Sequence, residues 1–143
     1  MPPLLYQRTA SLSDIAQTAD DITLLLKDAH ILLMQGDLGT GKTTLSKEIL
    51  KRYGVTSAVT SPTFNLVNEY SNASGQMFYH FDLYRIRHPE ELSEIGFFDY
   101  LDSGHLCLIE WPEIIESYIQ DKALYLRITH QDQNRLYEVW EIN

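Results

Sequence analysis

Residues 36–43 read Gly-Asp-Leu-Gly-Thr-Gly-Lys-Thr and match every fixed position of the phosphate-binding loop pattern G-x-x-x-x-G-K-[ST]. This loop requires a buried strand before it and a helix after it. An apolar run at 31–34 fits the strand, and Leu45, Ile49 and Leu50 recur at helical spacing before Gly54, which is placed to end the helix. The motif and its flanks therefore predict an α/β fold that binds a nucleoside triphosphate.

The residue types within the loop fit phosphate binding. We expect the glycines at 36, 39 and 41 to allow unusual backbone angles and to leave room for a phosphate. Backbone N–H groups and the positive end of the following helix attract phosphate oxygens. Lys42 would reach the β- and γ-phosphates, and the Thr43 hydroxyl would coordinate Mg²⁺. The loop residues predicted to bind the nucleotide are Gly36, Asp37, Leu38, Gly39, Thr40, Gly41, Lys42, Thr43 and Thr44.

The remainder of the chain predicts one domain, residues 1–143, built on a mixed sheet. Further strands are expected at 64–70, 77–83, 106–110, 124–129 and 136–142. Helices are expected at 11–28, from 89 onwards and at 97–101. Turn-forming residues predict hairpins at 72–75 and 131–134. We predict a phosphate-loop NTPase-like three-layer sandwich, whose sheet has a parallel centre and antiparallel margins.

Two acidic residues that end expected strands are candidates for the metal side of the site. We favour Glu110 as the metal ligand beside Thr43, because its strand is the more uniformly apolar and hence the more central. Asp82 is expected in the same pocket, where it would hold metal-bound water or orient the attacking water. A helix cap or a salt-bridge partner is the alternative for either acid. Lys42, Asp82 and Glu110 form the predicted catalytic set.

The segment after the first loop helix is polar and contains a proline, which predicts an extended loop. Thr63 lies on it and is a candidate switch residue that touches Mg²⁺ or the γ-phosphate. Ser61 is the alternative candidate on this segment, and a plain turn without such a role is the other. The chain lacks the Asn-Lys-x-Asp and Asp-x-x-Gly signatures of guanine-binding proteins, so we expect adenine.

The composition limits the partners. A net charge of −9 argues against stable, direct binding to nucleic acid, which normally requires a basic surface. The apolar runs are shorter than the roughly 20 residues of a membrane span, and the amino terminus lacks the pattern of a secretion signal. The single cysteine, Cys107, lies in an apolar run and is expected in the core. We expect a cytoplasmic protein.

Several separate segments together resemble the TsaE family of small bacterial ATPases in tRNA threonylcarbamoyladenosine synthesis. They are residues 36–44, 61–70, 80–85, 89–92 and 110–113. The resemblance extends over about residues 10–140. Thr40 stands where alanine is common, and Phe64 replaces a tyrosine; neither change threatens the expected function.

The resemblance implies a weak ATPase that uses ATP and Mg²⁺, yields ADP and depends on a complex of two partners, TsaD and TsaB. TsaD transfers the threonylcarbamoyl group to the adenosine beside the anticodon of tRNAs that read ANN codons. The protein would meet tRNA only through this complex. The resemblance also places Ser11 or Ser13, and Arg135, near the nucleotide. The alternative function is a nucleotide-gated switch that regulates the complex without essential turnover.

Overall fold

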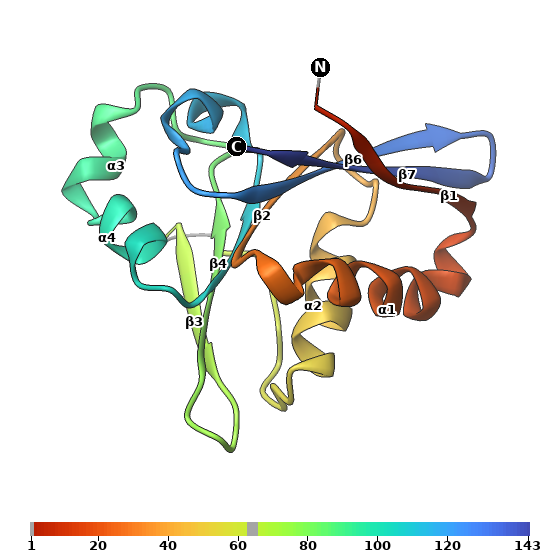
Figure 1. The fold of residues 1–143 in the computed structure, drawn as a ribbon, viewed down its shortest axis with the longest axis horizontal. Helices are drawn as coiled ribbons and strands as arrows, with labels where there is room; N and C mark the ends of the chain where they lie inside the picture. The colour runs from red at the N-terminus through yellow and green to blue at the C-terminus, as the bar shows by residue number, and fades with distance from the viewer. Residues whose placement is uncertain (1, 63–65) are drawn as a thin grey trace.

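The computed structural model describes residues 2–62 and 66–143, and within these ranges the strands form one seven-stranded sheet in the order β1-β7-β6-β2-β5-β4-β3 (Figure 1). The strands are β1 (Leu4–Ala10), β2 (Ile31–Gly36), β3 (Val67–Ser71), β4 (Met77–Asp82), β5 (Leu106–Glu110), β6 (Ala123–Gln131) and β7 (Asn134–Ile142). The pairs β6–β2, β2–β5 and β5–β4 are parallel, and the outer pairs are antiparallel. The predicted mixed sheet is thus confirmed.

The helices cover both faces of this sheet. They are α1 (Ile15–Leu25), α2 (Lys42–Arg52), α3 (Glu90–Glu94) and α4 (Phe97–Asp102), with short 3₁₀ turns η1 (Leu12–Asp14), η2 (Leu26–Asp28), η3 (Pro112–Ile114) and η4 (Glu116–Tyr118). Helix α1 packs against α2, and Figure 1 shows both apart from α3 and α4. None of the helices in residues 2–62 and 66–143 is long and apolar enough to cross a membrane.

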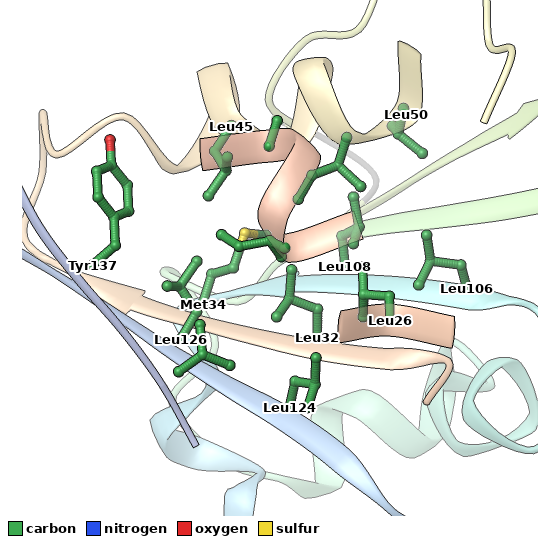
Figure 2. Close-up of a cluster of buried hydrophobic side chains, with 14 of the residues drawn as sticks. Leu26, Leu32, Met34, Leu45, Leu50, Leu106, Leu108, Leu124, Leu126 and Tyr137 are labelled. Atoms are coloured by element: carbon green, nitrogen blue, oxygen red, sulfur yellow. The ribbon is translucent and has the colours of Figure 1, made fainter. Parts of the chain in front are cut away.

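Alternate side chains of β2 enter two separate hydrophobic cores. Leu32 and Met34 pack with the inner faces of α1 and α2, as Figure 2 shows for the cluster around them. Ile31 and Leu33 pack on the opposite face with residues of α3 and α4. These four side chains of β2 are at most 1% exposed, which explains why residues 31–34 form an unbroken apolar run. The protein is therefore a three-layer α/β sandwich, as predicted.

Some boundaries differ from those expected. Helix 11–28 is divided into η1, α1 and η2, because the backbone tightens to 3₁₀ geometry at both ends. The Ser11 hydroxyl donates to the Asp14 carboxylate at 3.2 Å and makes no hydrogen bond to a backbone N–H group. Strand β1 was not predicted. Cys107 is fully buried in the second core, as expected.

Candidate nucleotide-binding site

The candidate site lies at the carboxyl ends of the parallel strands β2, β5 and β4. This is the edge where open α/β sheets commonly bind ligands. Strand β2 ends at Gly36, the loop follows, and α2 begins at Lys42. A cavity of about 280 Å³ opens here. It is lined by Leu38, Gly39, Thr40, Gly41, Lys42, Thr43, Thr44, Ser61, Asp82, Glu110 and Trp111. The structure thus brings seven of the nine predicted loop residues, 38–44, and both predicted acids to one cavity, whereas Gly36 and Asp37 are not among its lining residues.

Two of the loop glycines are required for different physical reasons. Gly41 has φ +97° and precedes α2, so it adopts a left-handed conformation that favours glycine. Gly36 belongs to β2 and has no positive φ; a Cβ there would lie 2.8 Å from the carbonyl oxygen of Ile128 and 2.8 Å from Thr40 Oγ1. Close packing against β6, rather than an unusual backbone angle, therefore excludes a side chain at position 36.

The loop is closed by a tight turn, and the start of α2 leaves backbone donors without an acceptor in the helix. Thr40 closes a tight turn by donating from its N–H group and its hydroxyl to the Asp37 carbonyl, at 3.3 and 2.9 Å. The first N–H groups of α2 have no acceptor within the helix, because helix geometry leaves the first turn unpaired. These groups and the positive end of α2 form a site for an anion.

Lys42 is held close to the loop. Its ammonium donates to the carbonyl of Gly36 and, at 3.2 Å, to that of Asp37. It also lies 4.0 Å from the centre of the Trp111 ring, within the range of a cation–π interaction. Burial lowers the pKa of Lys42 from its ordinary value, and the negative charges of Glu110 and of other nearby acids act in the opposite direction.

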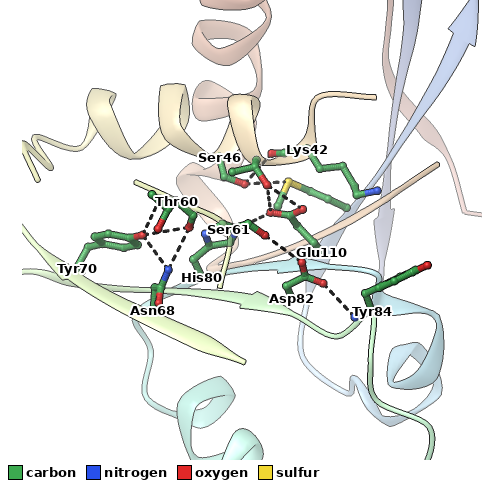
Figure 3. A network of polar contacts seen from close by, with 12 residues as sticks. Lys42, Ser46, Thr60, Ser61, Asn68, Tyr70, His80, Asp82, Tyr84 and Glu110 are labelled. Carbon is green, nitrogen blue, oxygen red and sulfur yellow. Dashed lines mark hydrogen bonds and ion pairs between the residues drawn. The ribbon is translucent and has the colours of Figure 1, made fainter. Parts of the chain in front are cut away.

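Glu110 accepts hydrogen bonds from two elements (Figure 3). The Thr43 hydroxyl lies 3.0 Å from Glu110 Oε2 and 3.3 Å from Oε1. On the neighbouring strand, His80 Nε2 lies 2.5 Å from Glu110 Oε2. Because the Thr43 proton points to the carboxylate, the hydroxyl oxygen keeps its lone pairs for a cation.

Asp82 lies directly opposite Glu110 in the parallel ladder between β4 and β5. Its Oδ2 accepts a hydrogen bond from Ser61 Oγ at 3.1 Å, and its Oδ1 accepts one from the Tyr84 backbone N–H group at 3.0 Å (Figure 3). Asp82 therefore lines the cavity and also fixes the turn after β4. Asp82 thus lies in the expected pocket, and the hydrogen bond to its second oxygen fixes a turn and does not cap a helix.

Two predicted residues far from the loop in sequence, Arg135 and Ser11, are not among the residues that line the cavity. Arg135 on β7 donates to the loop carbonyls of Thr40 and Gly39, at 3.3 and 3.4 Å, so it contacts the loop from its outer side. The Ser11 hydroxyl contacts Ser13 and Asp14, and does not line the cavity. Thr63 lies outside the described residues.

His80 is a site residue that the sequence interpretation missed. Its side chain is fully buried, and its ring contacts the acid that was predicted to bind the metal. The signal was present in the strand: His80 precedes Asp82 by two positions, so the two side chains point to the same face.

The donor set fits Mg²⁺ bound together with a nucleotide. In residues 2–62 and 66–143, no group of three or more His, Cys, Asp or Glu side chains is placed to hold a metal ion. Magnesium in nucleotide sites needs fewer protein ligands, because phosphate oxygens and water complete its octahedral shell. The Thr43 hydroxyl and the Glu110 carboxylate are oxygen donors of the type that this ion prefers.

Comparisons with known proteins agree with this geometry. The family model described as threonylcarbamoyl adenosine biosynthesis protein TsaE matches residues 9–137. The tRNA threonylcarbamoyladenosine biosynthesis protein TsaE of Haemophilus influenzae is 41% identical over 118 residues, which are 82% of this chain and 74% of that protein. The protein of the same name from Rickettsia conorii is 43% identical over 111 residues, 77% of this chain and 62% of that one.

The fold has a solved counterpart. The crystal structure of YdiB from Bacillus subtilis superposes with a TM-score of 0.76 at 26% identity, and the match covers 100% of this chain and 88% of that one. The similarity therefore extends over the whole sheet and includes the phosphate-binding loop. Taken together, the family model, the relatives above 40% identity and the shared fold show that this chain belongs to the TsaE family.

Proposed function

We propose that this protein binds ATP with Mg²⁺ and hydrolyses it in the biosynthesis of threonylcarbamoyladenosine in tRNA. The observation that carries the proposal is the Thr43–Glu110 hydrogen bond at the start of α2. It brings a hydroxyl and a carboxylate together in the cavity that also contains the buried Lys42. The names of its relatives supply the pathway, and we expect the reaction in the cytoplasm.

Each side chain has a role that its position supports. The N–H groups of the loop and of α2 bind phosphate oxygens, and Lys42 exchanges its two carbonyl acceptors for the β- and γ-phosphates. Thr43 and Glu110 would hold Mg²⁺, which when bound neutralises charge on the phosphates. Asp82 is placed beside Glu110, where it would orient the attacking water. Arg135 supports the loop from outside.

The partners follow from the family resemblance. We propose that a complex of TsaB and TsaD completes the competent site and that this protein is a weak ATPase alone. The acidic chain, with a net charge of −9, would reach tRNA through that complex instead of binding it directly.

The test is ATP turnover by the purified protein, alone and with an added TsaB–TsaD pair. Strong stimulation by the pair, lost in a Lys42→Ala protein, is the expected result. Stimulation that persists in Lys42→Ala would show that the hydrolysis occurs elsewhere. An absence of nucleotide binding would contradict the proposal at its first step.

One contact favours the alternative of a nucleotide-gated switch. Ser61, on the segment between α2 and β3, donates to Asp82 at the edge of the cavity, so a change at the acid would be transmitted to that segment. Glu110→Gln separates the two functions, because it keeps the size of the side chain and removes its charge. If this variant binds ATP and the partners and supports full tRNA modification without turnover, the switch is correct. A loss of modification together with turnover supports the ATPase.

A further inference from the structure

Within the described residues, His80 makes one polar side-chain contact, and it is directed at Glu110. The His80 side chain is fully buried in β4, and its Nδ1 has no hydrogen-bond partner in residues 2–62 and 66–143. Its Nε2 lies 2.5 Å from Glu110 Oε2. Because an ionised carboxylate only accepts, Nε2 is the nitrogen that carries a proton in this contact and donates it to Glu110.

Packing alone gives no reason for a histidine at this position. Phe78 lies two residues earlier on the same face of β4 and is part of the hydrophobic core. An apolar side chain of similar size at position 80 would avoid burying two ring nitrogens, one of which has no hydrogen-bond partner among the described residues. The single hydrogen bond to Glu110 is therefore the feature that distinguishes His80 from its core neighbours.

The two carboxylate oxygens of Glu110 differ in the hydrogen-bond contacts that they receive. Oε2 receives both the His80 N–H group and the shorter contact from the Thr43 hydroxyl, at 2.5 and 3.0 Å. Within the part of the chain that the structure describes, Oε1 receives only the longer contact from Thr43, at 3.3 Å. Oε1 thus keeps more free acceptor capacity. A donor that binds one oxygen also prevents the carboxylate from rotating about its terminal bond.

We propose that His80 is a positioning residue for the metal side of the nucleotide site. Its Nε2–H group holds Glu110 Oε2 and so fixes the carboxylate, with Oε1 and the Thr43 hydroxyl oxygen presented together to Mg²⁺ or to its water ligands. This inference rests on the proposed function. Side chains that orient metal ligands in this way typically contribute about 10- to 100-fold to metal affinity or activity.

Three substitutions at position 80 test the proposal. His80→Gln places an amide nitrogen four bonds from Cα, the same number as for the histidine Nε2, and can donate to Glu110. His80→Asn is equally polar, but its amide nitrogen is only three bonds from Cα, at the level of the histidine Nδ1, and does not reach Glu110. His80→Leu fills the space without a donor. The readout is the affinity for a non-hydrolysable ATP analogue, measured by calorimetry in EDTA and across a Mg²⁺ titration, with Tm for each variant.

We expect all three variants to bind the analogue like the parent in EDTA. The Leu and Asn variants should need about 10- to 100-fold more Mg²⁺ for half-maximal enhancement of binding, and Gln should stay close to the parent. The proposal would be overturned if the parent and the Leu and Asn variants all required the same Mg²⁺ concentration. It would also be overturned if all three variants failed to fold, because His80 would then be needed for stability. A parent whose binding shows no Mg²⁺ dependence would instead contradict the proposed function.

Discussion

Replacement of Lys42 by methionine should separate the function of its ammonium group from the cost of burying it. Lys42 is 5% exposed, its ammonium group donates to two carbonyls of the loop, and it lies 4.0 Å from the centre of the Trp111 ring. Methionine keeps most of the apolar stem and its contact with the ring. The substitution therefore removes the charge and the donors with little change in packing.

The effect on stability follows from the direction of the pKa shift. Burial lowers the pKa of Lys42 below 10.5 even though Glu110 and Asp82 favour the charged form. The folded chain thus holds this proton less tightly than the unfolded chain does. The free-energy penalty for burying the charged ammonium is fully present at every pH below the lowered pKa. It disappears as the pH rises to 10.5, the pKa of the lysine in the unfolded chain. At pH 7 methionine should raise the free energy of unfolding, by about 1 kcal/mol or less.

The same substitution should lower ATP turnover, although it should raise the free energy of unfolding. Loss of one donor that stabilises developing charge typically lowers kcat by about 10²- to 10³-fold, or roughly 3–4 kcal/mol. Thermal unfolding and partner-stimulated ATP turnover measure the two effects on the same protein. Lys47→Met is the matched control, because Lys47 is an exposed lysine on the same helix, and its substitution should change both readouts little. A Tm several degrees lower for Lys42→Met, with Lys47→Met unchanged, would refute the reasoning and make Lys42 a structural cation.

The structure makes further predictions. Gly39→Ala should lower the free energy of unfolding by about 1 kcal/mol, because its φ is +80° and nothing lies near the added methyl group. Gly36→Ala should lower it by more and abolish nucleotide binding, because the new Cβ would lie 2.8 Å from the Ile128 carbonyl oxygen. Thermal unfolding ranks the two, and the reverse order would contradict the packing argument. Arg135→Ala removes a donor to the loop carbonyl of Gly39 and should weaken ATP binding with little change in Tm; calorimetry that shows unchanged affinity would remove Arg135 from the site. Burial raises the pKa of the Cys107 thiol to about 12, so its alkylation at pH 8 should be slow and should accelerate only in denaturant; rapid reaction of the folded protein would contradict its burial.

The central strands and the loop were predictable because their signals are local. The four apolar residues at 31–34 and the run that ends at Glu110 describe strands covered on both faces. The structure places them side by side as β2 and β5, and it places Asp82 opposite Glu110 on the next strand. Acids that end neighbouring parallel strands necessarily come together at one edge of a sheet. This explains how two residues 28 positions apart could be assigned to one pocket from their strand positions alone.

Strand β1 could not be predicted from its own residues. It is paired with β7, at the opposite end of the chain, so the information that makes it a strand lies in its partner. Of its seven residues only Ala10 is buried, and the others are exposed or intermediate. The alternation that would indicate a strand is correspondingly weak. The same pairing brings Ala10 opposite Arg135, the β7 residue that donates to the loop carbonyl of Thr40.

His80 shows a second kind of limit. Residues that act directly on a ligand stand where strands end, and a search of strand ends therefore finds Asp82 and Glu110. A residue that orients such an acid lies two positions before the strand end, on the same face of the sheet. At that position a sequence pattern predicts a residue of the hydrophobic core. His80 occupies that place in β4 and is as buried as the phenylalanine that follows it. Its polarity inside an apolar strand was the usable signal, and its interpretation required a partner on the neighbouring strand that only the sheet register supplies.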